Sequence, residues 1–162
     1  MTKVEKNSPS PLQPGEISQG GIRYVLLRPD VLMGVAREMG DIAPEVFLNA
    51  LKRSAFVNGM RSFERYRDEG RFHGADALER TCNIAASLGW GEWVLHRQNA
   101  GIRLIEVRNS PFAAGYGASQ CPVCAPIVGI LEALTAVFYS AGHVEETACC
   151  SQGADTCRFR LG

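Results

Sequence analysis

The sequence predicts an α+β domain, with an antiparallel sheet built from two hairpins plus an N-terminal strand and with helices packed on one side. Apolar residues recur at helical spacing in the first half of the chain, whereas residues 92–108 and 142–161 alternate in two pairs of short segments. A chain of 162 residues fits one domain and can bury about 68–70% of its unfolded surface. The order of elements therefore indicates separate helical and sheet layers.

The chain is expected to begin with a flexible tail, residues 1–17, because this stretch is rich in proline and lacks periodicity. Residues 18–162 then form the single folded domain. Gly21–Arg28 predicts the N-terminal strand, since it is rich in Tyr, Val and Leu and is stopped by Pro29.

Helices are expected where apolar residues follow helical spacing and where proline and glycine mark the boundaries. Pro29 opens the first, and Gly40, Gly70 and Gly89 close the first three. The expected ranges are Asp30–Met39, Asp41 or Pro44 to Gly70, Ala75–Leu88 and Pro122–Ser140.

Two hairpins are expected from period-two alternation. The first joins Glu92–Gln98 to Gly101–Arg108, and the second joins Gly142–Cys150 to Thr156–Leu161. Between them, Asn109–Gln120 is a loop rich in Gly, Ser and Ala, long enough to be functional.

Charge and composition exclude some partners. The 17 Lys and Arg residues are interspersed with 17 Asp and Glu, giving a net charge of +0, so nucleic acid is not expected as principal partner. No apolar run reaches the ~18 residues of a membrane span. Because Met1–Pro14 lacks an apolar signal segment, we expect a cytoplasmic, reducing location. There, clustered cysteines indicate metal ligands or redox thiols.

Cysteines near the C-terminus have the spacing of a closed tetrahedral zinc site. Cys149 and Cys157 bracket one turn centred on Gly153, so the last hairpin brings their thiols together. A third thiol, Cys124, lies where a helix is expected to begin, and a helix N-terminus stabilises a thiolate.

The residues alone leave the fourth ligand open among Glu146, Cys121, Cys150 and His143. In a regular strand Glu146 and Cys149 point to opposite faces, so Glu146 would need a bulge or a bend. Two other interpretations compete with a metal site. Buried cysteines are common in cores, and Cys121 with Cys124 resembles a redox pair, although the βαβ context of that motif is missing.

Four aromatic residues are candidates for lining a ligand pocket: Trp90, Trp93, Phe112 and Tyr116. They fall around the first hairpin and the long loop, so we expect an apolar cavity between sheet and helices near that loop. His96 would supply one polar contact, although a solvent-facing strand position is the simpler interpretation. Ordinary packing is the alternative for each aromatic residue.

The last third of the chain resembles the 4-vinyl reductase family of small-molecule-binding domains. The matching features are Asn109-Ser110-Pro111-Phe112, Pro122-Val123-Cys124, Gly129 five residues after that cysteine, Glu146-Thr147-Ala148-Cys149, Gly153 and Cys157-Arg158-Phe159.

The resemblance implies a fold related to the sensory domains of aromatic-responsive activators and to subunits of the TRAPP trafficking complex. In those sensory domains zinc is held by Cys, Glu, Cys and Cys at this spacing. By resemblance, the zinc ligands are therefore Cys124, Glu146, Cys149 and Cys157, with Cys121 outside the set. The family also implies a hydrophobic ligand and pairing of two copies through helices, a homodimer.

The predicted function is a zinc-stabilised domain that binds an aromatic hydrocarbon or a tetrapyrrole precursor, as a sensor or a carrier. Because the chain ends at Gly162 without an output module, we expect it to act through a partner enzyme or regulator. The alternative is an enzyme, either a vinyl-group reductase of (bacterio)chlorophyll synthesis or a thiol oxidoreductase using Cys121 and Cys124. The sequence has no Gly-x-Gly-x-x-Gly, flavin signature or evident acid–base pair, which favours binding.

Overall fold

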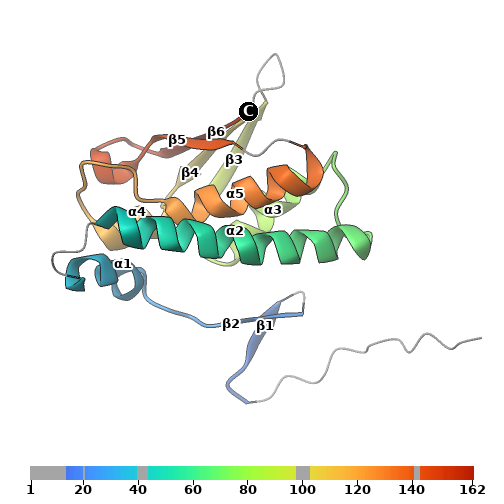
Figure 1. The fold of residues 1–162 in the computed structure, drawn as a ribbon, viewed down its shortest axis with the longest axis horizontal. Coiled ribbons are helices and arrows are strands. Elements are labelled where there is room, and N and C mark those ends of the chain that lie inside the picture. Colours follow the sequence, from blue (N-terminus) through green and yellow to red (C-terminus); the bar gives the residue numbers. More distant parts are fainter. Residues whose placement is uncertain (1–13, 20, 40–43, 98–102, 141–142) are drawn as a thin grey trace, which may run out of the picture.

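A computed structural model describes residues 14–19, 21–39, 44–97, 103–140 and 143–162. Its helices and strands confirm the α+β class, with helices on one side of a four-stranded sheet (Figure 1). The elements in chain order are β1 (Ile17–Gln19), β2 (Ile22–Tyr24), α1 (Pro29–Glu38), α2 (Pro44–Asp68), α3 (Ala77–Ser87), β3 (Glu92–Arg97), β4 (Arg103–Arg108), α4 (Pro111–Tyr116), α5 (Ala125–Phe138), β5 (Val144–Ala148) and β6 (Cys157–Leu161).

The sheet has the strand order β3-β4-β6-β5, and every neighbouring pair is antiparallel. Side chains alternate between its faces. Ile105 lies opposite Phe159 in the register, and both are buried on the face toward the helices. The other face carries ion pairs such as Arg160 with Glu145 and Arg108 with Glu106. Both predicted hairpins are thus confirmed, as is the one-sided helical packing.

Helix α5 lies beneath the sheet, and α2 runs beneath α5 (Figure 1). The two helices approach closely at Gly129, where a Cβ atom would lie 2.2 Å from the carbonyl oxygen of Lys52. Lys52 Nζ also lies 2.7 Å from the carboxylate of Glu132 on α5. The absence of a side chain at Gly129 therefore sets the distance between the helices.

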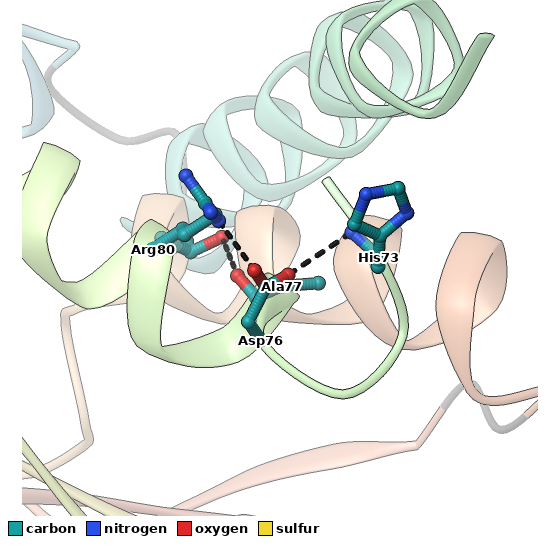
Figure 2. Close-up of polar contacts among 5 residues, drawn as sticks. His73, Asp76, Ala77 and Arg80 are labelled. Atoms are coloured by element: carbon teal, nitrogen blue, oxygen red, sulfur yellow. Dashed lines mark hydrogen bonds and ion pairs between the residues drawn. The ribbon is translucent and has the colours of Figure 1, made fainter. Parts of the chain in front are cut away.

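A local hydrogen-bond arrangement fixes the start of α3 (Figure 2). The carboxylate of Asp76 accepts from the backbone N–H of His73 at 3.0 Å and from Arg80 Nε at 2.7 Å. The backbone N–H of Ala77 donates to the carbonyl of His73 at 2.8 Å. These contacts bind the preceding loop to the first helical turn and so orient the rest of α3.

The predicted N-terminal strand forms, but the expectation that it joins the main sheet is wrong. Ile22–Tyr24 pairs instead with Ile17–Gln19, in a separate two-stranded sheet. This small hairpin is on the helical side of the molecule, away from the four-stranded sheet (Figure 1). A strand pairing with its immediate neighbour closes a very short loop at low entropic cost. Residues 1–13 of the predicted tail lie outside the described residues.

The predicted loop Asn109–Gln120 contains the short helix α4. Its signals are present in the sequence: Ser110 at the N-cap accepts from Ala113 N–H at 3.5 Å, and Pro111 takes the first helical position. Gly115 serves close packing there, since a Cβ atom would lie 2.4 Å from the carbonyl oxygen of Pro29. Gly115 therefore allows contact with α1, whereas Gly117 ends α4 at a φ of 84°.

None of the helices in the described part of the chain has the length and apolar character needed to cross a lipid bilayer.

We predict that Gly129→Ala destabilises the domain by about 1–3 kcal/mol, because the added methyl group overlaps the α2 backbone. Urea denaturation followed by circular dichroism measures the change. The matched control is Ala136→Ser, which adds one atom at an exposed position of the same helix. Equal stability of the two variants would show that the helices do not depend on this contact.

Candidate metal centre and helix-lined cavity

Three thiols and one carboxyl group meet beside the last hairpin. One ligand atom from each of Cys124, Glu146, Cys149 and Cys157 lies within 4.8 Å of all the others. The sulfur atoms of Cys124 and Cys157 are 3.6 Å apart. Two thiolates on a tetrahedral zinc ion lie about 3.8 Å apart, given zinc–sulfur bonds of about 2.3 Å. The group is therefore able to hold a metal ion with little movement.

Each thiol is placed by the end of an element. Cys124 is the N-cap residue of α5, Cys149 follows β5, and Cys157 begins β6. A 3₁₀ turn at Cys150–Gln152 reverses the chain between the last two, and it ends at Gly153 with φ of 90°. A side chain at that φ would be strained, so glycine allows the tight reversal.

The bulge that the sequence required for Glu146 is present. Pairing between β5 and β6 shifts register between Glu146 and Ala148, and this irregularity lets Glu146 and Cys149 reach the same side. Cys121, Cys150 and His143 lie outside the four-residue group. Cys150 contributes its backbone, because its N–H donates to Cys157 Sγ at 3.3 Å.

The four groups strongly shift one another's pKa values. Hydrogen bonds from the Cys124 and Cys157 thiols lower the pKa of Cys149, which makes it the favoured thiolate. Donation to Cys149 raises the pKa of Cys124. Burial, followed by the charge on Cys149, raises the pKa of Glu146 to about 8. Without a cation, the cluster thus retains protons near neutral pH.

One carboxylate oxygen in the cluster lacks a partner. Glu146 Oε2 accepts from the backbone N–H of Cys124 at 3.0 Å. Glu146 Oε1 is buried and has no hydrogen-bond partner among the described residues. A buried, unsatisfied oxygen is costly unless a cation or a donor is bound there. The donor set of three sulfurs and one oxygen therefore fits a borderline-soft divalent ion.

A cavity of about 400 Å³ lies between α2 and α3, with part of α5 as its floor. No residue of β3–β6 lines it, so this cavity lies within the helical layer, whereas the sequence predicted a cavity between sheet and helices. The reason is that α5, with buried Ile127 and Leu131, fills the space against the sheet. The lining residues are Ile22, Tyr24, Leu32, Leu51, Ser54, Ala55, Asn58, Gly59, Ser62, Phe63, Tyr66, Phe72, Thr81, Ile84, Ala85, Leu88, Trp90, Phe112, Pro126 and Ile130.

Two of the four predicted aromatic residues line this cavity. Trp90 and Phe112 meet edge to face, with ring centroids 5.0 Å apart. Trp93 is buried on the inner face of β3 and donates from Nε1 to the Trp90 carbonyl at 2.9 Å. Tyr116 is half-buried at the end of α4 and is not among the lining residues. His96 is exposed on the outer face of the sheet, 3.8 Å from Glu106.

Many of the lining residues that sequence reasoning missed lie on α2 and on the loop that follows it. Phe63, Tyr66 and Phe72 form one aromatic end of the cavity, and the rings of Tyr66 and Phe72 are 5.0 Å apart. Ser54, Asn58 and Ser62 also line it. Their spacing of four along a helix was a usable signal, since it predicts one polar row beside the apolar stripe.

The metal cluster and the cavity share structural elements. Ser110 Oγ lies 3.2 Å from Cys124 Sγ, and Ser110 begins the helix that carries Phe112. Pro126, two residues after Cys124, lines the cavity from α5. Ser151, in the turn of the last hairpin, donates from Oγ to the Ala113 carbonyl at 3.3 Å. A cross-link in the cluster would therefore hold one wall of the cavity.

Residues 104–162 match the V4R domain family, which confirms the resemblance inferred from the cysteine motifs. A search of the curated proteins found no match. Among solved structures, the phenol-responsive sensory domain of the transcription activator PoxR, crystallised with phenol, is similar at 21% identity. The alignment has a TM-score of 0.75 and covers 91% of this chain and 80% of that one.

Two further structures share the fold. A vinyl-4-reductase family protein from Methanocaldococcus jannaschii aligns at 19% identity with a TM-score of 0.54, over 83% of this chain and 92% of that one. A trafficking protein particle complex subunit 3 from Naegleria fowleri, covalently bound to palmitic acid, aligns at 11% identity with a TM-score of 0.56. That alignment covers 82% of this chain and 93% of that one. At these identities the likeness establishes the fold.

Proposed function

We propose, from the V4R domain in residues 104–162, that this chain is a zinc-stabilised domain that binds a hydrophobic small molecule. The observation that carries the proposal is the cavity of about 400 Å³, lined mainly by apolar and aromatic residues. Ligand sites in proteins have this size and character. The PoxR sensory domain, which shares the fold, was crystallised with phenol.

An aromatic hydrocarbon or a phenol fits the cavity better than a tetrapyrrole precursor. Tetrapyrrole precursors carry carboxylates, and the described lining residues include no Lys, Arg or His to pair with them. The lining likewise has no Cys, His or carboxylate pair for acid–base chemistry. These features support binding over reduction of a vinyl group. A sensor or a carrier would pass its signal or its ligand to a partner protein.

The thiol oxidoreductase alternative has little support. Cys124 is completely buried, and its sulfur contacts Cys157 and Ser110. A redox thiol has to reach its substrate as an accessible thiolate. Burial and the raised pKa of Cys124 oppose that role.

Zinc would be held by Cys124, Glu146, Cys149 and Cys157. A zinc ion in such a closed site supplies a cross-link and positive charge, and it takes no part in chemistry. The backbone N–H of Cys150 and the hydroxyl of Ser110 would support the sulfur atoms. The cross-link would join α5 to the last hairpin, and through Ser110 it would steady the Phe112 wall of the cavity.

A homodimer is the proposed assembly. Val25 and Leu26 are each 81% exposed and Leu27 is 53% exposed, in the stretch between β2 and α1. Val31 and Val35 extend this apolar surface along α1. Contiguous exposed apolar side chains mark interaction surfaces, and a second copy of the chain is the partner we propose.

We predict one zinc ion per chain and its loss in Cys157→Ser. Removing a thiolate should reduce zinc affinity sharply and destabilise the domain, because zinc binding to such sites contributes folding free energy. Elemental analysis and thermal unfolding measure both effects. Cys121→Ser is the matched control and should retain the metal, since Cys121 lies outside the cluster. Metal-free protein from a chelator-free preparation would refute the site.

Zinc affinity should rise with pH between about 6 and 8. Because the pKa of metal-free Glu146 is raised to about 8, its carboxyl is largely protonated below that pH. Zinc requires the carboxylate, so binding releases this proton, and its contribution to the slope ends above about pH 8. Competition with a chromophoric chelator at several pH values measures the slope. Glu146→Gln should give a shallower slope, and an unchanged slope would contradict the role of Glu146.

Filling the cavity should abolish ligand binding without unfolding the domain. Ile84 lines the cavity from α3 and is half-buried, so Ile84→Trp places a large ring inside it. Equilibrium dialysis with naphthalene measures binding. Asn83→Trp, at the adjacent exposed position, is the matched control and should bind as the wild type does. Wild-type protein that shows no saturable binding of naphthalene or its derivatives would refute the proposed function.

A further inference from the structure

The polar side chains of the cavity are concentrated on one helix. Ser54, Asn58 and Ser62 lie four residues apart on α2 and all line the cavity. Residues at this spacing fall on one face of a helix, one above another. We call these three residues the α2 polar row. The other lining residues with polar side-chain atoms are Tyr24, Tyr66, Thr81 and Trp90.

Two side-chain hydrogens of this row, one on Asn58 and one on Ser62, are donated to the helix backbone. Ser62 Oγ–H donates to the carbonyl of Asn58 at 3.0 Å, and Asn58 Nδ2 donates to the carbonyl of Ser54 at 2.9 Å. Thr81 on α3 has the same bond, from Oγ1 to the Ala77 carbonyl at 2.8 Å. A hydroxyl has one hydrogen, so Ser62 offers only its lone pairs to a ligand. Asn58 offers its carbonyl oxygen as an acceptor and keeps one Nδ2 hydrogen as a donor.

The row lies along the outer edge of the cavity. Ser54 and Asn58 are exposed and Ser62 is half-buried, whereas Gly59 and Phe63 on the adjoining stripe are buried. The cavity therefore has an apolar interior with hydrogen-bond acceptors along one rim. No Lys, Arg, His, Asp or Glu occurs among the described residues that line it. An ionised ligand would lose hydration there without gaining an opposite charge.

We propose that the ligand is an uncharged amphiphile whose O–H or N–H group donates to Asn58 Oδ1 or to Ser62 Oγ. Its apolar body lies against the aromatic end formed by Phe63, Tyr66 and Phe72. Asn58 and Ser62 are thus the residues that select a ligand with a hydrogen-bond donor over an isosteric ligand without one. This inference rests on the proposed function, because it assigns the chemistry recognised in the same cavity.

Matched aromatic probes test the inference by equilibrium dialysis at neutral pH. The donor probe is 2-naphthol, while naphthalene and 2-methoxynaphthalene lack a donor and bracket its size. We expect 2-naphthol to bind about 3- to 10-fold more tightly than either, the effect of one net hydrogen bond. The anion 2-naphthoate should bind most weakly. If 2-methoxynaphthalene binds as tightly as 2-naphthol, donor groups of the cavity direct recognition, such as the tyrosine hydroxyls or the second Asn58 Nδ2 hydrogen, and the inference is wrong.

Variants at the rim locate the acceptors. Asn58→Leu combined with Ser62→Ala should abolish the preference for 2-naphthol over naphthalene. Both positions are exposed or half-buried, and neither side chain contributes to the core. Asn49→Leu makes the same change at an exposed α2 residue outside the cavity and is the matched control. If the double variant retains the preference for 2-naphthol, the inference is wrong and the proposed function stands. If no probe binds the wild-type protein, both the inference and the proposed function are wrong.

Discussion

Three buried thiols and one half-buried carboxyl group meet where α5 joins the last hairpin, and their proximity constrains the packing around them. Their ligand atoms lie within 4.8 Å of one another, and the pKa of Glu146 is raised to about 8. Four acidic groups this close cannot all ionise in a low-dielectric interior unless a cation balances them. The cluster therefore either stays largely protonated or holds a metal ion. Under the proposed function, zinc resolves this constraint.

The same cluster is connected to one wall of the cavity. Cys124 starts α5, and Ser110, which contacts its sulfur, starts the helix that carries Phe112. At the far side, Gly129 lets α2 approach α5 so closely that no side chain fits between them. The cavity lies beside this contact, since Ala55 of α2 and Ile130 of α5 both line it. Its walls are thus held by neighbouring packing, and its interior can accommodate a ligand.

The sheet and the helical layer have different roles in this arrangement. The sheet supplies an inner face of buried apolar residues and an outer face of paired charges, so it serves the fold. The helices supply every lining residue on a regular element except Ile22 and Tyr24, which come from the separate hairpin. Binding is therefore proposed for the helical layer, where loops and helix faces are able to vary without disturbing strand pairing.

From the sequence alone, most of the helices, the two hairpins and the three thiols of the cluster could be predicted, whereas Glu146 as fourth ligand came from the family resemblance. Helical spacing, Pro and Gly boundaries and period-two alternation are local properties, and the spacing of Cys149 and Cys157 around Gly153 is local too. It also showed that Glu146 would need a bulge, which β5 has. The pairing of the N-terminal strand and the position of the cavity depend on contacts between distant segments, so only the tertiary structure shows them. The N-terminal strand pairs within its own hairpin, and α5 occupies the space against the sheet, which moves the cavity between helices. Periodicity fixes which face of an element is apolar, but the partner of that face depends on how whole elements pack.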